Sequence, residues 1–463
     1  MQQPEISAVS KITEVAVRQG MTSRIIRLLV PILTVFLLFD LEYTVGTLVS
    51  QGERLGHSTI LVNGILTPAS FVNISVKVSD IVILIIFAFL CAQYFIYHRL
   101  PFFESRFLYH YGFLMLFVGF GLTSLLWNAQ AFSAAQFFVS LLYLAKFFET
   151  CLIFALVHVY FKEGGRVLAL LEPLVIAALV AALIGLFYTF TGFSEGWLIQ
   201  DRIQFFGILV LLAMMFLGVV LFPRSGQTIT ALGQGTLWLV IIVMSISIYA
   251  CGKRTVIVGF LAGLTYMFMR YMNKQNWLKF LLIYLAFIGV GSPFLLQQVA
   301  RSFDRESNYI WEGLAPQFAT RLEESWLSSI KVPGLDFSIT ERFGRWLVAF
   351  DHFIEQPLLG SGFFGSPYVH GFLPDSAFLQ VMVETGVLGA FALGGFMVIC
   401  WFITPLKKDM AYGYGLGVGF RSALIAMVVM GITANNVYAF NLFGMFLVLA
   451  ALNADISRDH HAV

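Results

Sequence analysis

The sequence predicts an all-α membrane protein that crosses the bilayer many times, and two observations predict this class. Of the 463 residues, 59% are hydrophobic and only 12% are charged. A typical soluble protein carries about 25% charged residues, and a soluble core cannot absorb this much apolar surface. The apolar residues also fall in runs of about 20, which is the length of a helix that crosses the hydrocarbon core.

About twelve such runs follow one another along the chain. They cover residues 25–48, 79–97, 107–128, 135–160, 167–190, 204–223, 233–251, 255–273, 278–296, 377–403, 415–434 and 437–454. From them we expect spans one to nine in residues 1–296 and spans ten to twelve with a cytoplasmic tail in residues 377–463. Between these parts, residues 297–376 form a polar loop domain.

Lysine and arginine indicate the orientation, because short cytoplasmic loops carry an excess of both. With a cytoplasmic N-terminus, most of these cations lie inside, and the short outer loops keep only Arg54, Lys77, Arg202, Lys253 and Arg254. We therefore expect both termini in the cytoplasm and the 297–376 loop outside. The few outer cations depart from the usual rule and suggest a function.

Net charge and cysteine placement exclude other classes of function. A net charge of +2 gives no field suited to nucleic acid. The four cysteines, Cys91, Cys151, Cys251 and Cys400, are scattered, and each lies in an apolar run. They are therefore interpreted as small membrane residues and not as a disulfide framework or a metal site.

The 297–376 loop is long for a compact membrane protein, and such loops are usually functional. It contains two amphipathic helix patterns, over residues 314–330 and 339–356. In the second pattern, Arg342, Arg345 and His352 share one face. The donor fork of arginine fits phosphate oxygens, so this face predicts an anion site. A solvated face that binds lipid headgroups explains the same spacing, and both interpretations stay open.

The segment after this helix holds glycines and two candidate bases. Gly360 and Gly362 allow positive φ and a close backbone approach to an anion, although a plain turn uses the same residues. His370 and Asp375 follow, just before the tenth span. Aspartate at the position of Asp375 is also a good helix N-cap, and the two roles can coexist.

Three segments of the sequence, in their order along the chain, resemble the signature of the Wzy polymerase and O-antigen ligase superfamily. They are Arg342-Phe343-Gly344-Arg345-Trp346, Pro357-Leu358-Leu359-Gly360-Ser361-Gly362, and Asp375-Ser376 opening a helix that reaches Glu384-Thr385-Gly386. Gly252-Lys253-Arg254-Thr255 and Asp201-Arg202 resemble two upstream pieces, and the likeness covers residues 195–400. The ligases have His where this chain has Asp375, and the Asp-Ser form is more similar to polymerases.

The resemblance implies a type C glycosyltransferase in the bacterial inner membrane, with a periplasmic active site and no cofactor. Such an enzyme transfers a growing glycan from undecaprenyl diphosphate to a sugar hydroxyl of a lipid-linked repeat unit, in the synthesis of O-antigen or exopolysaccharide. No Asp-x-Asp metal motif lies on an outer loop, which fits metal independence. The implied partners are the undecaprenyl-diphosphate-linked oligosaccharide, membrane lipid and a regulator of chain length.

The resemblance also implies residue roles. The expected diphosphate-binding residues are Arg254, Arg342 and Arg345, with Arg202 and Lys253. The expected base is Asp375 or, second, His370. The expected supporting residues are Gly360, Gly362, Trp346 and Glu384. Glu384 lies on a different face of the tenth span from Asp375, so the two do not form a carboxylate dyad.

Three alternatives remain. The first is an O-antigen ligase, which transfers finished polymer to the lipid A core of lipopolysaccharide. The second is a peptidoglycan polymerase of the SEDS group, which fits the arginine and glycine pattern less well. The third is a polysaccharide transporter or flippase, which predicts charge along a mid-membrane pathway. Within the spans, Lys146 and Glu149 are interpreted as an i, i+3 ion pair, with Lys146 in a lipid-diphosphate cavity as the alternative.

Overall fold

The structure, a computed structural model, describes part of the chain. The described residues are 24–39, 42–47, 61–62, 65–66, 73–97, 108–191, 202–222, 233–271, 278, 281–282, 284–289, 293, 337–370, 373–403, 413–434 and 439–456. The helix expected over 314–330 lies outside them. The ninth expected span, 278–296, is described only in part.

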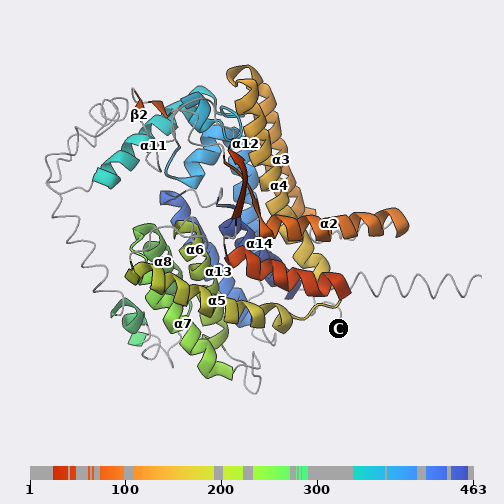
Figure 1. Ribbon diagram of the computed structural model, residues 1–463. Helices are drawn as coiled ribbons and strands as arrows, with labels where there is room; N and C mark the ends of the chain where they lie inside the picture. Colours follow the sequence, from red (N-terminus) through yellow and green to blue (C-terminus); the bar gives the residue numbers. More distant parts are fainter. Residues whose placement is uncertain are drawn as a thin grey trace, which may run out of the picture.

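Long helices make up most of the described chain and follow the predicted spans closely (Figure 1). They are α2 (Val78–Tyr97), α3 (Leu108–Trp127), α4 (Ala134–Lys162), α5 (Val167–Thr191), α6 (Arg202–Leu221), α7 (Gly233–Ala250), α8 (Arg254–Tyr271), α11 (Phe337–Glu355), α12 (Ala377–Ile403), α13 (Gly413–Thr433) and α14 (Phe440–Ile456). The predicted all-α polytopic membrane fold is confirmed. Within the described residues, seven helices are long and apolar enough to cross a membrane. The total of twelve spans stays a prediction.

The first predicted span, 25–48, is wrong in its second half. Residues 24–38 are helical, but strand β1 (Glu42–Thr47) follows and pairs antiparallel with β4 (Asn73–Lys77). A second antiparallel pair joins β2 (Leu61–Val62) to β3 (Ile65–Leu66). Acidic Asp40 and Glu42 are costly in hydrocarbon, and β-branched Thr44, Val45 and Thr47 favour a strand, so this stretch leaves the helix.

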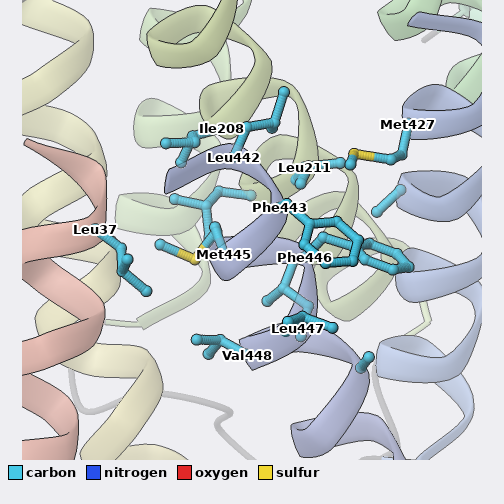
Figure 2. Packing of buried hydrophobic residues seen from close by; sticks show 14 of the residues in the cluster. Leu37, Ile208, Leu211, Met427, Leu442, Phe443, Met445, Phe446, Leu447 and Val448 are labelled. Carbon is cyan, nitrogen blue, oxygen red and sulfur yellow. The ribbon is translucent and has the colours of Figure 1, made fainter. Parts of the chain in front are cut away.

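Helix α6 lies at the centre of the bundle, and 94% of its most apolar stretch is buried. Helices α7, α8, α13 and α14 pack around it. Phe443 and Phe446 of α14 lie among side chains that include Leu211 of α6 and Met427 of α13 (Figure 2). Gly218 of α6 lies against the α13 backbone, which shows the close approach that small residues give to membrane helices.

The helix contacts show which helix ends lie together. Gly218, late in α6, contacts Gly415, early in α13, and Gly259, early in α8, contacts Met430, late in α13. Both α6 and α8 therefore run antiparallel to α13, and they begin where α13 ends. At the same place the Ala377 N–H, at the start of α12, donates to the Ala434 carbonyl at 3.1 Å.

We call this the arginine end of the bundle, because α6 begins at Arg202 and α8 at Arg254. The helices α12 and α13 meet there, through Ala377 and Ala434. Residues that are far apart in the sequence are thus placed at one end of the molecule by helix packing alone.

Substitution of Gly218 by alanine tests the close packing of α6. A methyl group there overlaps the α13 backbone at Gly415 and Gly419, so Gly218→Ala is expected to destabilise the fold by about 1–3 kcal/mol. Gly394→Ala in α12 is the matched control, because its methyl group meets nothing within 4 Å. Thermal unfolding of the purified proteins in detergent measures both. Equal midpoints for the two variants would contradict the packing described here.

Candidate functional site

The polar face of α11 packs against the segment that leads into α12. Arg342 Nε lies 3.9 Å and Arg345 Nη1 lies 3.6 Å from Asp375 Oδ2. About two turns further along the helix, the His352 ring stacks on the His370 ring, with centroids 3.7 Å apart. The expected helix over 339–356 is present as α11, and its two arginines converge on one carboxylate.

The arginine–carboxylate cluster remains accessible. The side chains of Arg342, Arg345 and Asp375 are 31%, 23% and 34% exposed. At such exposure an ion pair contributes only about 0–1 kcal/mol, so the cluster is not a rigid structural element.

Ser376 provides the N-cap of α12. Its Oγ accepts a hydrogen bond from the Leu379 N–H at 3.5 Å and donates to the Gly431 carbonyl of α13 at 3.3 Å. The interpretation of Asp375 as the capping residue is therefore wrong by one position. The cap holds the backbone beside Asp375 and leaves the carboxylate directed to the arginines.

His370 lies at the end of a π-helical turn, η5 (Ser366–His370). Burial and the neighbouring His352 ring lower the pKa of His370 to about 3, so the imidazole is neutral at physiological pH. Its Nε2 is buried and has no hydrogen-bond partner among the described residues. A neutral imidazole of this kind is suited to hydrogen-bonding a hydroxyl, but it is a weak acceptor of a full proton.

The glycine loop, residues 357–364, fills a break in α12. The break is at Gly386, which has φ 66° and ψ −166°. The Ser361 and Gly362 N–H groups donate to the carbonyls of Val383 and Glu384, at 2.8 and 3.1 Å. The interpretation of this loop as an anion-binding nest is therefore wrong, because these donors are used within the protein.

The two glycine-containing pieces of the sequence pattern contact each other. Gly360 has φ 68°, and a Cβ atom there would overlap the backbone at Val383 and Glu384. A Cβ atom at Gly386 would overlap the backbone of Leu358. Only glycine combines positive φ with so close an approach, so both positions require it.

Glu384 connects the loop to the helix. Its carboxylate is fully buried and accepts hydrogen bonds from the Phe364 N–H and from Gln380 Nε2, each at 2.9 Å. Phe364 is strained, with φ 53°, and its ring stacks on Tyr143 of α4 at 3.7 Å. Glu384 thus holds the loop in place and does not approach Asp375 as a second carboxylate.

Two residues that the sequence pattern did not identify hold this region: Ser124 in α3 bonds to α12, and Asn128, just after α3, bonds to the glycine loop. Ser124 Oγ donates to the Glu384 carbonyl at 2.7 Å, and Asn128 Nδ2 donates to the Gly360 carbonyl at 2.9 Å. Their i, i+4 spacing at the end of an otherwise apolar span was the available signal. It identifies a polar face but not its partner.

The remaining cations lie at the arginine end. Lys253 and Arg254 are exposed at the start of α8, and the next residue, Thr255, accepts a hydrogen bond from Thr433 of α13 at 3.0 Å. Ser376, next to Asp375, contacts Gly431 in the same turn of α13. Arg254 and Asp375 therefore flank one helix end, and Arg202 begins α6 at that end.

Trp346, the remaining expected supporting residue, packs edge-on against Phe343 on α11, with ring centroids 5.2 Å apart. Its indole Nε1 is buried and has no hydrogen-bond partner among the described residues. The ring therefore supports the helix that carries the two arginines, and its N–H is left as a donor.

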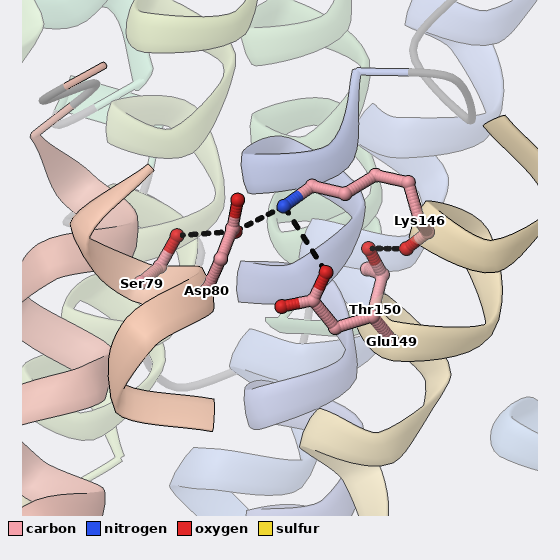
Figure 3. A network of polar contacts seen from close by, with 5 residues as sticks. All are labelled: Ser79, Asp80, Lys146, Glu149 and Thr150. Atoms are coloured by element: carbon pink, nitrogen blue, oxygen red, sulfur yellow. Dashed lines mark hydrogen bonds and ion pairs between the residues drawn. The ribbon is translucent and has the colours of Figure 1, made fainter. Parts of the chain in front are cut away.

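The predicted ion pair between Lys146 and Glu149 is confirmed, at 3.3 Å (Figure 3). Lys146 also pairs with Asp80 of α2, which the sequence reasoning missed because it stands at the start of a predicted span. Two carboxylates thus engage Lys146 within the protein. This arrangement favours a structural role between α2 and α4 over the alternative in a lipid-diphosphate cavity.

Comparison with known proteins adds one finding. Residues 239–394 match the model of the O-antigen ligase family. The matched segment runs from α7 into α12 and includes Lys253, Arg254, all of α11, the glycine loop and Asp375, whereas Arg202 precedes it. No curated protein matches the chain.

Replacement of Glu384 tests the attachment of the glycine loop. Glu384→Ala leaves the Phe364 N–H and the Gln380 amide buried without their acceptor, at a cost of about 1–3 kcal/mol each. Glu384→Gln keeps an acceptor oxygen, so its loss of stability should be clearly smaller. Thermal unfolding in nanodiscs compares the two. If the alanine and glutamine variants unfold at the same midpoint temperature, the hydrogen bonds of Glu384 do not hold the loop.

Proposed function

We propose that the protein is a polysaccharide polymerase of the superfamily of O-antigen ligases and Wzy polymerases, and the match of residues 239–394 to the O-antigen ligase family supports this proposal. It transfers a growing glycan from undecaprenyl diphosphate to a sugar hydroxyl of a lipid-linked repeat unit. The reaction takes place at the periplasmic face of the bacterial inner membrane and requires no metal ion. A regulator of chain length is a further expected partner.

One observation carries this proposal: Arg342 and Arg345 converge on Asp375 at the end of the bundle where α8 begins with Arg254. A diphosphate leaving group carries several negative charges, and cations placed beside it stabilise the charge that develops as it leaves. Arginine forks suit phosphate oxygens in geometry as well as in charge. Lys253 and Arg202 add positive charge at the same end.

The proposed chemistry is a displacement at the anomeric carbon of the donor glycan. The acceptor hydroxyl oxygen forms a bond to this carbon while the bond from the carbon to the diphosphate oxygen breaks. The hydroxyl proton passes to a base, and undecaprenyl diphosphate leaves as the anion held by the arginines. A positioned base contributes about 10²–10⁴-fold in such reactions.

Asp375 is the proposed base and His370 is the second choice. The low pKa of His370 suits it to orient a sugar hydroxyl more than to accept its proton. The carboxylate of Asp375 lies beside the two arginines, so it is next to the position proposed for the leaving group. A base here is close to both reacting partners.

A ligase is the second candidate function. The description of the matching family, O-antigen ligase, favours it. The aspartate at position 375 favours the polymerase, because the ligases carry histidine at the corresponding place. The two activities differ in the acceptor, which is a lipid-linked repeat unit for a polymerase and the lipid A core for a ligase.

Reconstitution of the purified protein in liposomes with lipid-linked repeat units tests the function. Arg254→Ala, Arg342→Ala and Asp375→Asn should each lower chain extension by about 10²–10³-fold, because each removes a group that acts in the transition state. Arg270→Ala is the matched control, since Arg270 lies in the last turn of α8, at the opposite end from Arg254. Gel separation of the products measures extension.

The assay also separates the candidates. Products that grow by whole repeat units identify a polymerase, whereas transfer to added lipid A core and to nothing else identifies a ligase. Full activity of Arg342→Ala with either acceptor would overturn the assignment of the diphosphate site.

A further inference from the structure

Asp375 occupies the place where the two arginines of α11 meet. Its Oδ2 atom is the shared partner of Arg342 and Arg345, at 3.9 and 3.6 Å. Both distances exceed the roughly 2.7–2.9 Å of a close charge-assisted hydrogen bond. The carboxylate is thus attracted by both guanidinium groups while all three side chains stay partly exposed.

The backbone around Asp375 is fixed on the side of α12. Ser376 is bonded to Gly431 of α13, and the Ala377 N–H is bonded to the Ala434 carbonyl. Pro374, on the other side, is buried. Release of Asp375 from the arginines therefore requires rotation of its side chain and no movement of helix α12.

We infer that Asp375 is an internal substitute for the diphosphate of the donor: it pairs with Arg342 and Arg345 and is displaced from them when the donor binds. This inference rests on the proposed function and adds its regulation. The base becomes available to an acceptor hydroxyl only after the diphosphate has taken its place on the arginines. Productive binding is then ordered, with the donor before the acceptor.

Energetics favour this exchange. An ion pair of such exposure contributes about 0–1 kcal/mol, so little is lost when it opens. A diphosphate brings more negative charge than a carboxylate and offers oxygens to both forks at once. The carboxylate also balances two guanidinium groups that would otherwise repel each other.

The exchange also completes the catalytic cycle. After displacement, Asp375 accepts the proton of the attacking hydroxyl as the new glycosidic bond forms and the bond to the diphosphate breaks. When Asp375 then loses this proton to water, its carboxylate competes again for Arg342 and Arg345. That competition assists the departure of undecaprenyl diphosphate.

Binding of undecaprenyl diphosphate to the full-length protein in detergent, measured by microscale thermophoresis, tests the inference. Asp375→Asn should bind about 2- to 5-fold more tightly than wild type, because a competing anion of about 0.5–1 kcal/mol is removed. Asp351→Asn, on the same helix as the arginines, is the matched control and should bind as wild type does. Arg342→Ala should bind more weakly.

These outcomes separate the inference from the proposed function. If wild type binds, Arg342→Ala weakens binding and Asp375→Asn fails to tighten it, the substitute role of Asp375 is wrong while the diphosphate site stands. If wild type does not bind undecaprenyl diphosphate, both fail.

A second measurement uses only the wild-type protein, in case Asp375→Asn does not fold. Carbodiimide coupling of an amine to Asp375, followed by peptide mass spectrometry, reports the accessibility of the carboxylate. Added undecaprenyl diphosphate should increase coupling at Asp375 and leave coupling at Asp351 unchanged. Unchanged or decreased coupling at Asp375 would overturn the inference.

Discussion

The contact of Arg342 and Arg345 with Asp375 is the interaction on which the rest of the site depends. It joins an amphipathic helix outside the membrane-spanning bundle to the start of α12. Two attachments make it possible. The glycine loop, which follows α11 in the chain, is held in the break of α12 by the buried Glu384. At the start of α12, Ser376 and Ala377 are hydrogen-bonded to the end of α13.

The carboxylates of Glu384, in α12, and Asp375, just before α12, have different tasks because their surroundings differ. Glu384 is fully buried, and hydrogen bonds from Phe364 and Gln380 compensate the cost of removing it from water. Asp375 is about one-third exposed and faces arginines, so its partners are exchangeable. Burial thus makes Glu384 a structural group, and exposure leaves Asp375 accessible to a ligand.

Much of this architecture could be predicted from the sequence, since apolar runs of the length of a bilayer predict helices and the spacing of Arg342, Arg345 and His352 places them on one face. Contacts between distant segments could not be predicted. Gly360 and Gly386 indicate tight backbone positions. The sequence does not show, however, that the loop around Gly360 packs against the helix break at Gly386. The sequence pattern placed the N-cap of α12 one residue early, at Asp375, because aspartate and serine are both favoured at an N-cap.

A structure determined with undecaprenyl diphosphate bound in a nanodisc tests the central claim most directly. The diphosphate should lie on Arg342 and Arg345, near the start of α8, with the Asp375 carboxylate turned away from both guanidinium groups. A diphosphate bound elsewhere, with Asp375 still paired to both arginines, would contradict it.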